Sequence, residues 1–210
     1  MIVIVDYGMG NLGSIANMLK KVKAEAVISS RVEEIDRADK LILPGVGAFD
    51  NGMQKLGDRN LIPLLNRRVL EERVPILGLC LGMQLFTQSS EEGALPGLGW
   101  FEARTVRFSF AGSTEKDLKI PHMGWGFTQL RRPNPLCAGL EAGDTRFYFA
   151  HSFYVTPAQA ETVLATSHYG HDFAAIIGRD NIVGTQFHPE KSHRFGMSLL
   201  ANFAERFQCI

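Results

Sequence analysis

The chain has 210 residues, of which 45% are hydrophobic and 21% charged, as in ordinary globular proteins. Lysine plus arginine equals aspartate plus glutamate, and a net charge of +0 without basic runs argues against nucleic acid as the main partner. The three widely spaced cysteines (Cys80, Cys137 and Cys209) fit a reducing cytoplasm better than a disulfide scaffold or a zinc site. The apolar stretch 1–5 is too short for a signal peptide or a membrane span. We therefore expect one cytoplasmic domain over residues 1–210, without a membrane or nucleic-acid partner, a metal or a cofactor.

In the first half of the chain, short apolar runs alternate with helical patterns. Strands are predicted over residues 2–5, 26–29, 40–43 and 74–77. Helices are predicted over residues 12–22 and over 48–70, with an interruption near 57–63. This alternation predicts an α/β domain with a mostly parallel central sheet flanked by helices. Three glycine-rich turns follow predicted strands, so we expect them to gather on one edge of the sheet; they are residues 8–10, 45–47 and 78–82.

The second half is richer in glycine and proline and is expected to add an antiparallel portion. Short strands are predicted over residues 104–110, 146–150, 162–166, 174–177 and 182–186. Residues 119–127 are predicted to form a loop, because a proline and two glycines interrupt any period. An amphipathic helix is predicted over residues 197–207.

The stretch 74–84, VPILGLCLGMQ, has the pattern of a nucleophile elbow. Gly78 and Gly82 lack the β-carbons that would clash where a strand turns sharply into a helix, which we expect over residues 83–88. Cys80 lies between them, at the predicted first turn of the helix, where the helix dipole favours a thiolate. A buried structural cysteine is the alternative interpretation, since free cysteines are among the most buried residues.

A rival pattern precedes the first predicted helix. Gly8, Gly10 and Gly13 fit the G-x-G-x-x-G spacing of a dinucleotide-binding motif between a strand and a helix. Such a motif needs an acidic residue at the end of the second strand, and none occurs before Glu33. The dinucleotide interpretation is therefore the weaker of the two.

A histidine and a carboxylate follow the last predicted strand. A thiolate nucleophile needs a base, and the base needs a third group that orients it. His188 and Glu190 are two residues apart, so in an extended backbone their side chains would point the same way. Five other histidines are present, and His188 is singled out by its place after a strand together with Glu190.

The combination resembles class I, triad-type glutamine amidotransferases, and more closely the glutaminase subunits of imidazole glycerol phosphate synthase. The resemblance covers nearly the whole chain through IVDYGMGNL at 3–12, LPGVGAF at 43–49, GLCLGMQLF at 78–86, PGLGW at 96–100, PHMGW at 121–125, FAHSFYV at 149–155 and GTQFHPEKS at 184–192. The triad motifs are shared by all class I relatives, whereas DYGMGNL and PHMGW are much narrower. The implied fold is that of a class I glutamine amidotransferase.

The resemblance implies a role for each triad residue. Cys80 is the nucleophile that attacks the carboxamide of L-glutamine, His188 is the general base and then acid, and Glu190 orients His188. The backbone N–H of Leu81 is one expected donor to the oxyanion. The second is expected from the turn at 44–47, from Val46 with Gly47 beside it, once the peptide has turned.

The family pattern also implies residues for substrate and partner. Glutamine is expected to contact Gln84 and backbone around Ser152 and Phe153, with Glu92 on its ammonium group. The ammonia is expected to pass to a (β/α)₈-barrel synthase subunit, which makes imidazole glycerol phosphate and an aminoimidazole carboxamide ribotide. Partner contacts are expected from Asn11, Met123 and Trp125, with core packing as the alternative for Trp125.

Two positions depart from the family pattern. Gly126 replaces the asparagine of PHMGWN, and Phe153 stands where tyrosine is common. Paralogous glutaminases that supply ammonia to surface-sugar enzymes are therefore an alternative to the histidine pathway. An inactive binding relative is a second alternative, against which the intact Cys80, His188 and Glu190 count.

Overall fold

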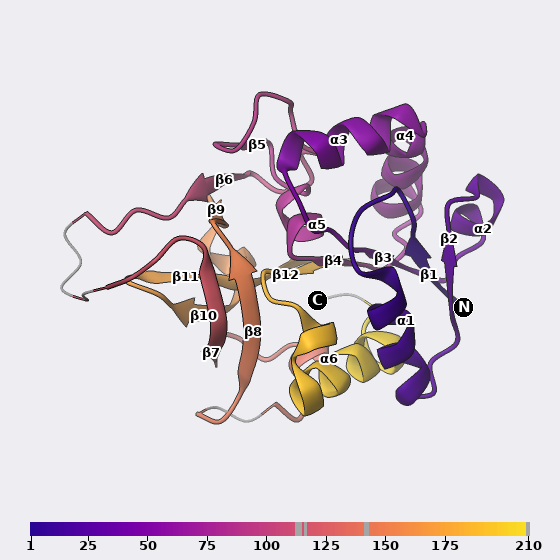
Figure 1. Cartoon of the computed structure of the whole chain (residues 1–210). Helices are drawn as coiled ribbons and strands as arrows, with labels where there is room; N and C mark the ends of the chain where they lie inside the picture. The colour runs from indigo at the N-terminus through magenta and orange to yellow at the C-terminus, as the bar shows by residue number, and fades with distance from the viewer. Residues whose placement is uncertain (112–114, 116, 141–142, 209–210) are drawn as a thin grey trace.

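The computed structural model describes residues 1–111, 115, 117–140 and 143–208. A nine-stranded sheet forms its centre, in the order β2-β1-β3-β4-β12-β11-β10-β7-β8 (Figure 1). Parallel pairing joins β2 (Ala26–Ser29), β1 (Ile2–Val5), β3 (Lys40–Leu43), β4 (Ile76–Leu79) and β12 (Ile182–Thr185). Antiparallel pairing continues through β11 (Asp172–Arg179), β10 (Val163–His168), β7 (His122–Leu130) and β8 (Arg146–His151). The predicted antiparallel portion is therefore continuous with the parallel sheet.

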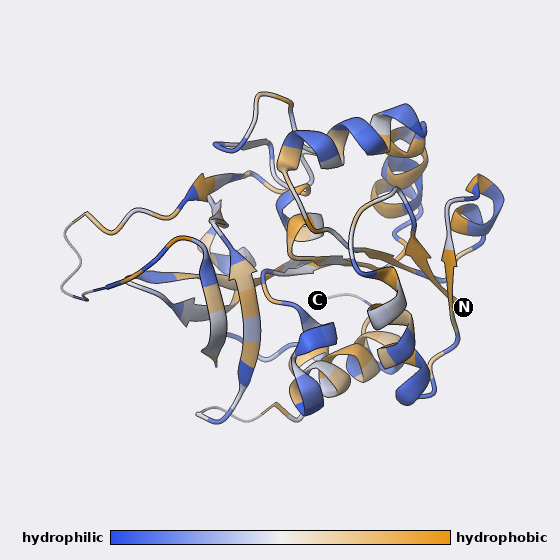
Figure 2. Cartoon of the chain, in the orientation of Figure 1, coloured by the Kyte–Doolittle hydropathy of each residue, from blue (hydrophilic) through white to orange (hydrophobic). Residues whose placement is uncertain are grey.

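Helices cover both faces of the parallel half (Figure 1). One face carries α1 (Leu12–Lys21) and α6 (His193–Glu205), and the other carries α3 (Phe49–Asp58), α4 (Leu61–Asn66) and α5 (Leu81–Gln84). A short α2 (Val32–Asp36) and a π-helical turn (Arg67–Glu71) complete this half. Figure 2 shows hydrophobic residues along the central strands and mixed faces on the helices. Alternate strand residues supply the two cores, so Val3 and Leu41 pack on one face and Ile4 and Ile42 on the other.

A three-stranded sheet lies beside the central one. It contains β5 (Ser89–Ser90), β6 (Ala103–Arg107) and β9 (Phe153–Pro157), in that order. Short 3₁₀ helices occur at Pro135–Cys137, Ala160–Thr162 and Pro189–Lys191. None of the helices that the structure describes has both the length and the apolar character needed to cross a membrane.

Two predicted boundaries around the elbow are wrong. The fourth strand begins at Ile76 and ends at Leu79, so Val74 and Pro75 precede it. The helix spans Leu81–Gln84, where residues 83–88 were expected. The strand continues into the elbow because Gly78 is paired with both neighbouring strands, β3 and β12.

The loop predicted over residues 119–127 is also wrong from His122 onward. His122–Leu130 forms β7, whose first six residues pair with β8 and whose last three pair with β10. The strand signal is hidden because the large apolar side chains of β7 face outward, while His122 and Gly126 face inward. Gly126 illustrates this, since a β-carbon there would lie 3.0 Å from the Phe149 ring. The missing side chain leaves room for the Phe149 ring of the neighbouring strand β8.

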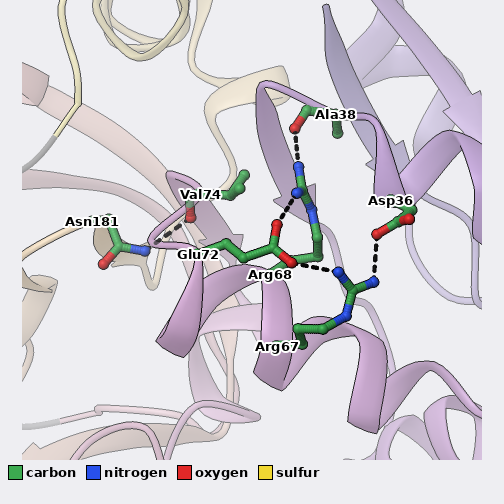
Figure 3. Close-up of polar contacts among 7 residues, drawn as sticks. All are labelled: Asp36, Ala38, Arg67, Arg68, Glu72, Val74 and Asn181. Carbon is green, nitrogen blue, oxygen red and sulfur yellow. Dashed lines mark hydrogen bonds and ion pairs between the residues drawn. The ribbon is translucent and has the colours of Figure 1, made fainter.

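A polar network lies where the parallel strands begin (Figure 3). Arg68 donates to the carbonyl of Ala38, and both Arg67 and Arg68 pair with Glu72. Asn181, just before β12, donates to the carbonyls of Val69 and Val74 at 2.9 Å each. These contacts tie the segments that lead into β3, β4 and β12 to one another.

Candidate active site

The predicted elbow is present at the end of β4. Cys80 is the N-terminal cap of α5 and has φ 53° and ψ −107°, a conformation that side chains rarely adopt. A β-carbon at Gly82 would lie 1.9 Å from the carbonyl oxygen of Leu43, and one at Gly78 would lie 2.6 Å from the Phe86 ring. The backbone therefore approaches its neighbours too closely for larger residues at either glycine. The turn presents a strained, 6% exposed cysteine at the carboxyl end of the strand.

His188 and Glu190 lie beside this elbow because β12 is the parallel neighbour of β4. His188 Nδ1 and Glu190 Oε1 are 2.8 Å apart, and both side chains are almost fully buried. The backbone is extended only at His188; Glu190 lies in the 3₁₀ helix Pro189–Lys191, so the expected extended pair is wrong in detail. The tight turn nevertheless brings the carboxylate back to the imidazole.

The electrostatics of His188 are set by burial and by two charged neighbours. Burial by itself lowers the pKa of His188, but charge and hydrogen bonding with Cys80, and with Glu190, outweigh it and raise the pKa to about 10. Since Nδ1 faces Glu190, Nε2 is the nitrogen left for the sulfur. His188 is therefore protonated at neutral pH, and its positive charge lies beside the Cys80 sulfur.

A cavity of about 330 Å³ opens over the cysteine. Val46, Gly47 and Leu81, the predicted oxyanion residues, all contribute to its wall. Leu81 is the first residue of α5, and the first N–H groups of a helix have no partner within the helix. Gly47 has φ +124°, and the Tyr7 hydroxyl donates to the Pro44 carbonyl at 2.6 Å, which fixes the start of this turn.

The sequence of residues 3–207 matches the family model for class I glutamine amidotransferases. This chain belongs to the class I glutamine amidotransferase family. Relatives named imidazole glycerol phosphate synthase subunit HisH 2 are 49% identical in Methanococcus maripaludis and 48% in Pseudomonas aeruginosa, each covering 98% of this chain and 100% or 99% of the relative. A HisH subunit from Bdellovibrio bacteriovorus is 44% identical, over 98% of this chain and 100% of its own length.

Solved structures share the fold of this chain. The structure of PurLQS from Thermotoga maritima superposes with a TM-score of 0.67 at 17% identity, over 96% of this chain and 96% of that one. A glutamine amidotransferase from the same organism gives 0.66 at 16% identity, over 98% and 96%. The expected amidotransferase fold is thus confirmed, and the family replaces the dinucleotide interpretation of Gly8, Gly10 and Gly13.

The four predicted glutamine contacts of this amidotransferase all line the cavity: Gln84, Glu92, Ser152 and Phe153. Gln84 is buried and its Nε2 donates to the Phe153 carbonyl at 2.9 Å, which also accepts from His151 Nδ1 at 2.8 Å. Glu92 Oε2 accepts from the Phe49 backbone at the start of α3. Gln84 and Glu92 are therefore already hydrogen-bonded to the protein backbone, whether or not they also contact substrate. Nothing in the structure explains phenylalanine rather than tyrosine at position 153.

The predicted partner residues separate into two places. Met123 and Trp125 lie on the outward face of β7, 64% and 46% exposed, so core packing is the wrong interpretation for Trp125. Phe127, which was not predicted from the sequence, extends this stripe and is 63% exposed. Met123 also lines the cavity. Asn11 lies at the start of α1, where its side chain accepts from the Ser14 backbone, and it is not part of the cavity wall.

Three polar residues around the amidotransferase site were not predicted from the sequence. His151 and Lys191 line the cavity, and Gln186 Nε2 lies 3.7 Å from Cys80 Sγ. Burial lowers the pKa of His151 to about 3, despite its hydrogen bond to Phe153. Gln186 and Lys191 both fall inside the GTQFHPEKS motif, so their closeness to His188 in the sequence could have predicted that they lie at the site.

Proposed function

We propose that this chain hydrolyses L-glutamine to glutamate and ammonia at Cys80 and supplies the ammonia to the cyclase subunit of imidazole glycerol phosphate synthase in histidine biosynthesis. The observation that carries this proposal is the array of Cys80, His188 and Glu190, in which Cys80 and His188 line the cavity and Glu190 pairs with His188. The high identity to HisH subunits over almost the full length supports the pathway. We further propose that residues 1–210 act as one domain, in the cytoplasm.

The chemistry follows from the order of groups. The Cys80 thiolate adds to the carboxamide carbon of glutamine, and the resulting tetrahedral intermediate carries an oxyanion. His188 gives its proton to the nitrogen, the carbon–nitrogen bond breaks, and ammonia leaves a glutamyl thioester. His188 then takes a proton from water, which attacks the thioester and releases glutamate and the thiolate. Glu190 holds the imidazole through Nδ1 during both steps.

The oxyanion requires two backbone donors, for which we propose Leu81 and Val46. The Leu81 N–H opens α5 beside the sulfur. Val46 lies in an exposed turn. The Tyr7–Pro44 hydrogen bond anchors the turn before Val46, and Gly47, which has a positive φ, follows it. A rotation of the peptide before Val46 would bring its N–H toward the cavity without moving either anchor.

The barrel cyclase partner is proposed to dock over the cavity mouth. Met123 borders the cavity and continues as the exposed stripe with Trp125 and Phe127 along β7. Covering this stripe would bury apolar side chains and close the route by which ammonia escapes to water. Asn11 is proposed to contribute at the edge of the same interface.

The test is the rate of glutamine hydrolysis under three conditions: the chain alone, with the cyclase subunit, and with the cyclase subunit plus its phosphoribulosyl acceptor. We expect slow turnover alone and a rise of roughly 10²–10³-fold in the full complex, the value of one oxyanion donor. A fast isolated chain that ignores its partner would contradict the gating by Val46. Absence of hydrolysis in every condition would support an inactive binding relative.

The same assay separates the two acceptors. Hydrolysis that responds to the histidine-pathway cyclase, with formation of imidazole glycerol phosphate, supports the proposal. Hydrolysis without response or product would favour the surface-sugar paralogue.

A further inference from the structure

Gln186 is a fully buried amide directly behind the nucleophile. It follows β12, two residues before His188, and its backbone N–H donates to the Ala175 carbonyl. Its side chain makes two contacts, from Nε2 to Cys80 Sγ at 3.7 Å and from Oε1 to Gln84 Nε2 at 3.2 Å. A polar side chain that is removed from water in this way is retained only with its partners satisfied.

The direction of this amide is fixed by its neighbours. The Phe153 carbonyl can only accept, so the end of Gln84 that faces it, 2.9 Å away, must be the NH₂ group. The second hydrogen of that NH₂ group goes to Gln186, which must therefore present its oxygen. The remaining end of Gln186, its own NH₂ group, faces the sulfur. The Phe153 carbonyl oxygen in the cavity wall thus determines, through Gln84, that Gln186 presents its Nε2 to the Cys80 sulfur.

We propose that Gln186 is a positioning residue that holds the Cys80 sulfur as a thiolate and aims it at the glutamine pocket. It deepens the proposed glutaminase chemistry and rests on Cys80 being the nucleophile. An N–H donor stabilises the charged sulfur over the neutral thiol. Unlike His188, the amide keeps its donor through the whole cycle, so it also stabilises the thiolate when the thioester breaks.

Several titratable groups surround the same sulfur and set the background for a pH test. His188 and Tyr7 act on Cys80 directly, His188 being paired with Glu190, and the cavity wall adds Glu92, His151 and Lys191. A substitution at Gln186 changes none of these side chains. A change confined to Gln186 variants therefore reports the amide.

The test is the rate of Cys80 alkylation by iodoacetamide across pH, with the modified peptide identified by mass spectrometry. Gln186→Glu keeps an oxygen for Gln84 and loses the donor to the sulfur. Gln186→Met loses the donor without adding charge. Gln88→Glu is the matched control, since Gln88 is exposed, outside the cavity, and takes the same charge change. No glutamine turnover is needed, so this test can fail independently of the proposed function.

In Gln186→Met, we expect the rise of the Cys80 alkylation rate with pH to occur about half to one pH unit higher than in the parent chain. A shift of this size corresponds to the loss of one net hydrogen bond. Gln186→Glu should shift the rise further, and Gln88→Glu should match the parent chain. Circular dichroism checks that each variant is folded; if Gln186→Glu is not, Gln186→Met decides alone. The proposal would be overturned if the pH dependence of alkylation were unchanged in a folded Gln186→Met variant. It would also be overturned if the alkylation rate fell by the same factor at every pH.

Discussion

The two ends of the parallel strands differ in what their side chains do. Where the strands begin, Arg68, Glu72 and Asn181 bind connecting segments together (Figure 3). Where they end, Cys80 and Gly47 have positive φ, and Glu190 Oε2 is buried without a hydrogen-bond partner among the described residues. One end of the sheet is thus built for stability, whereas the other holds strain and charge near the cavity.

This difference predicts that substitutions at the two ends have separable effects. Substitutions at the carboxyl ends of the parallel strands should change activity more than stability. Substitutions at the amino ends should change stability more than activity. Measuring both quantities on each variant tests the comparison.

Apart from the nucleophile itself, the largest effect is expected at His188. His188→Ala should reduce glutaminase kcat/KM in the saturated complex by about 10²–10⁴-fold, because the thiolate loses its counter-ion and ammonia its proton donor. Glu190→Gln should be milder, since the imidazole remains and loses only the charge that orients it. Steady-state kinetics of both variants measure this. If Glu190→Gln were the more damaged enzyme, the assignment of roles would be wrong.

Asn181→Ala tests the opposite end of the sheet. Two buried carbonyls, those of Val69 and Val74, lose a hydrogen bond, and the free energy of unfolding should fall by about 2 kcal/mol. Denaturant titration measures the loss, and kcat in the complex should stay at the parent value. A variant with parent stability and impaired kcat would reverse the comparison.

Cys80→Gly tests the strain at the elbow. Removing the β-carbon at φ 53° and ψ −107° should raise the free energy of unfolding by about 1 kcal/mol while abolishing glutamine hydrolysis. Cys80→Ala keeps the β-carbon and serves as the control, with no gain expected. Equal stability of the two variants in denaturant would mean that the turn is not strained.

A pH-dependent test concerns the pair His122 and His151, whose Nδ1 and Nε2 atoms are 3.3 Å apart. Burial lowers the pKa of His122 to about 4 and that of His151 to about 3, against an ordinary value of 6.5. Between pH 6.5 and 4 the two histidines are protonated in the unfolded chain but neutral in the folded one. Their contribution to the free energy of unfolding is therefore fully present above pH 6.5 and is lost as pH falls toward 4. Thermal midpoints should decline over this window, and His122→Phe should decline less steeply. Identical slopes would assign the acid sensitivity elsewhere.

Much of this architecture is readable in the sequence because parallel strands are continuous apolar runs. The first three strands and the glycines of the elbow follow from that pattern alone. β7 does not, because the large apolar residues Met123, Trp125 and Phe127 face outward while His122 and Thr128 are buried, which inverts the usual alternation. His188 could be predicted from its place after the last strand together with Glu190, and the pairing of β4 with β12 explains why it lies beside Cys80. The motif around His188 includes Gln186, but the contact of Gln186 with Cys80 appears only in the structure. Such contacts depend on three-dimensional packing that no local pattern encodes.

The most direct test of the central claim uses one complex of the cyclase subunit with Cys80→Ala. Product formation is measured first with glutamine and then with an ammonium salt as nitrogen source. We predict that glutamine-dependent formation is lost and that ammonium-dependent formation continues at nearly the parent rate, because the sulfur only releases ammonia. Retained activity with glutamine, or loss of both activities, would contradict the account.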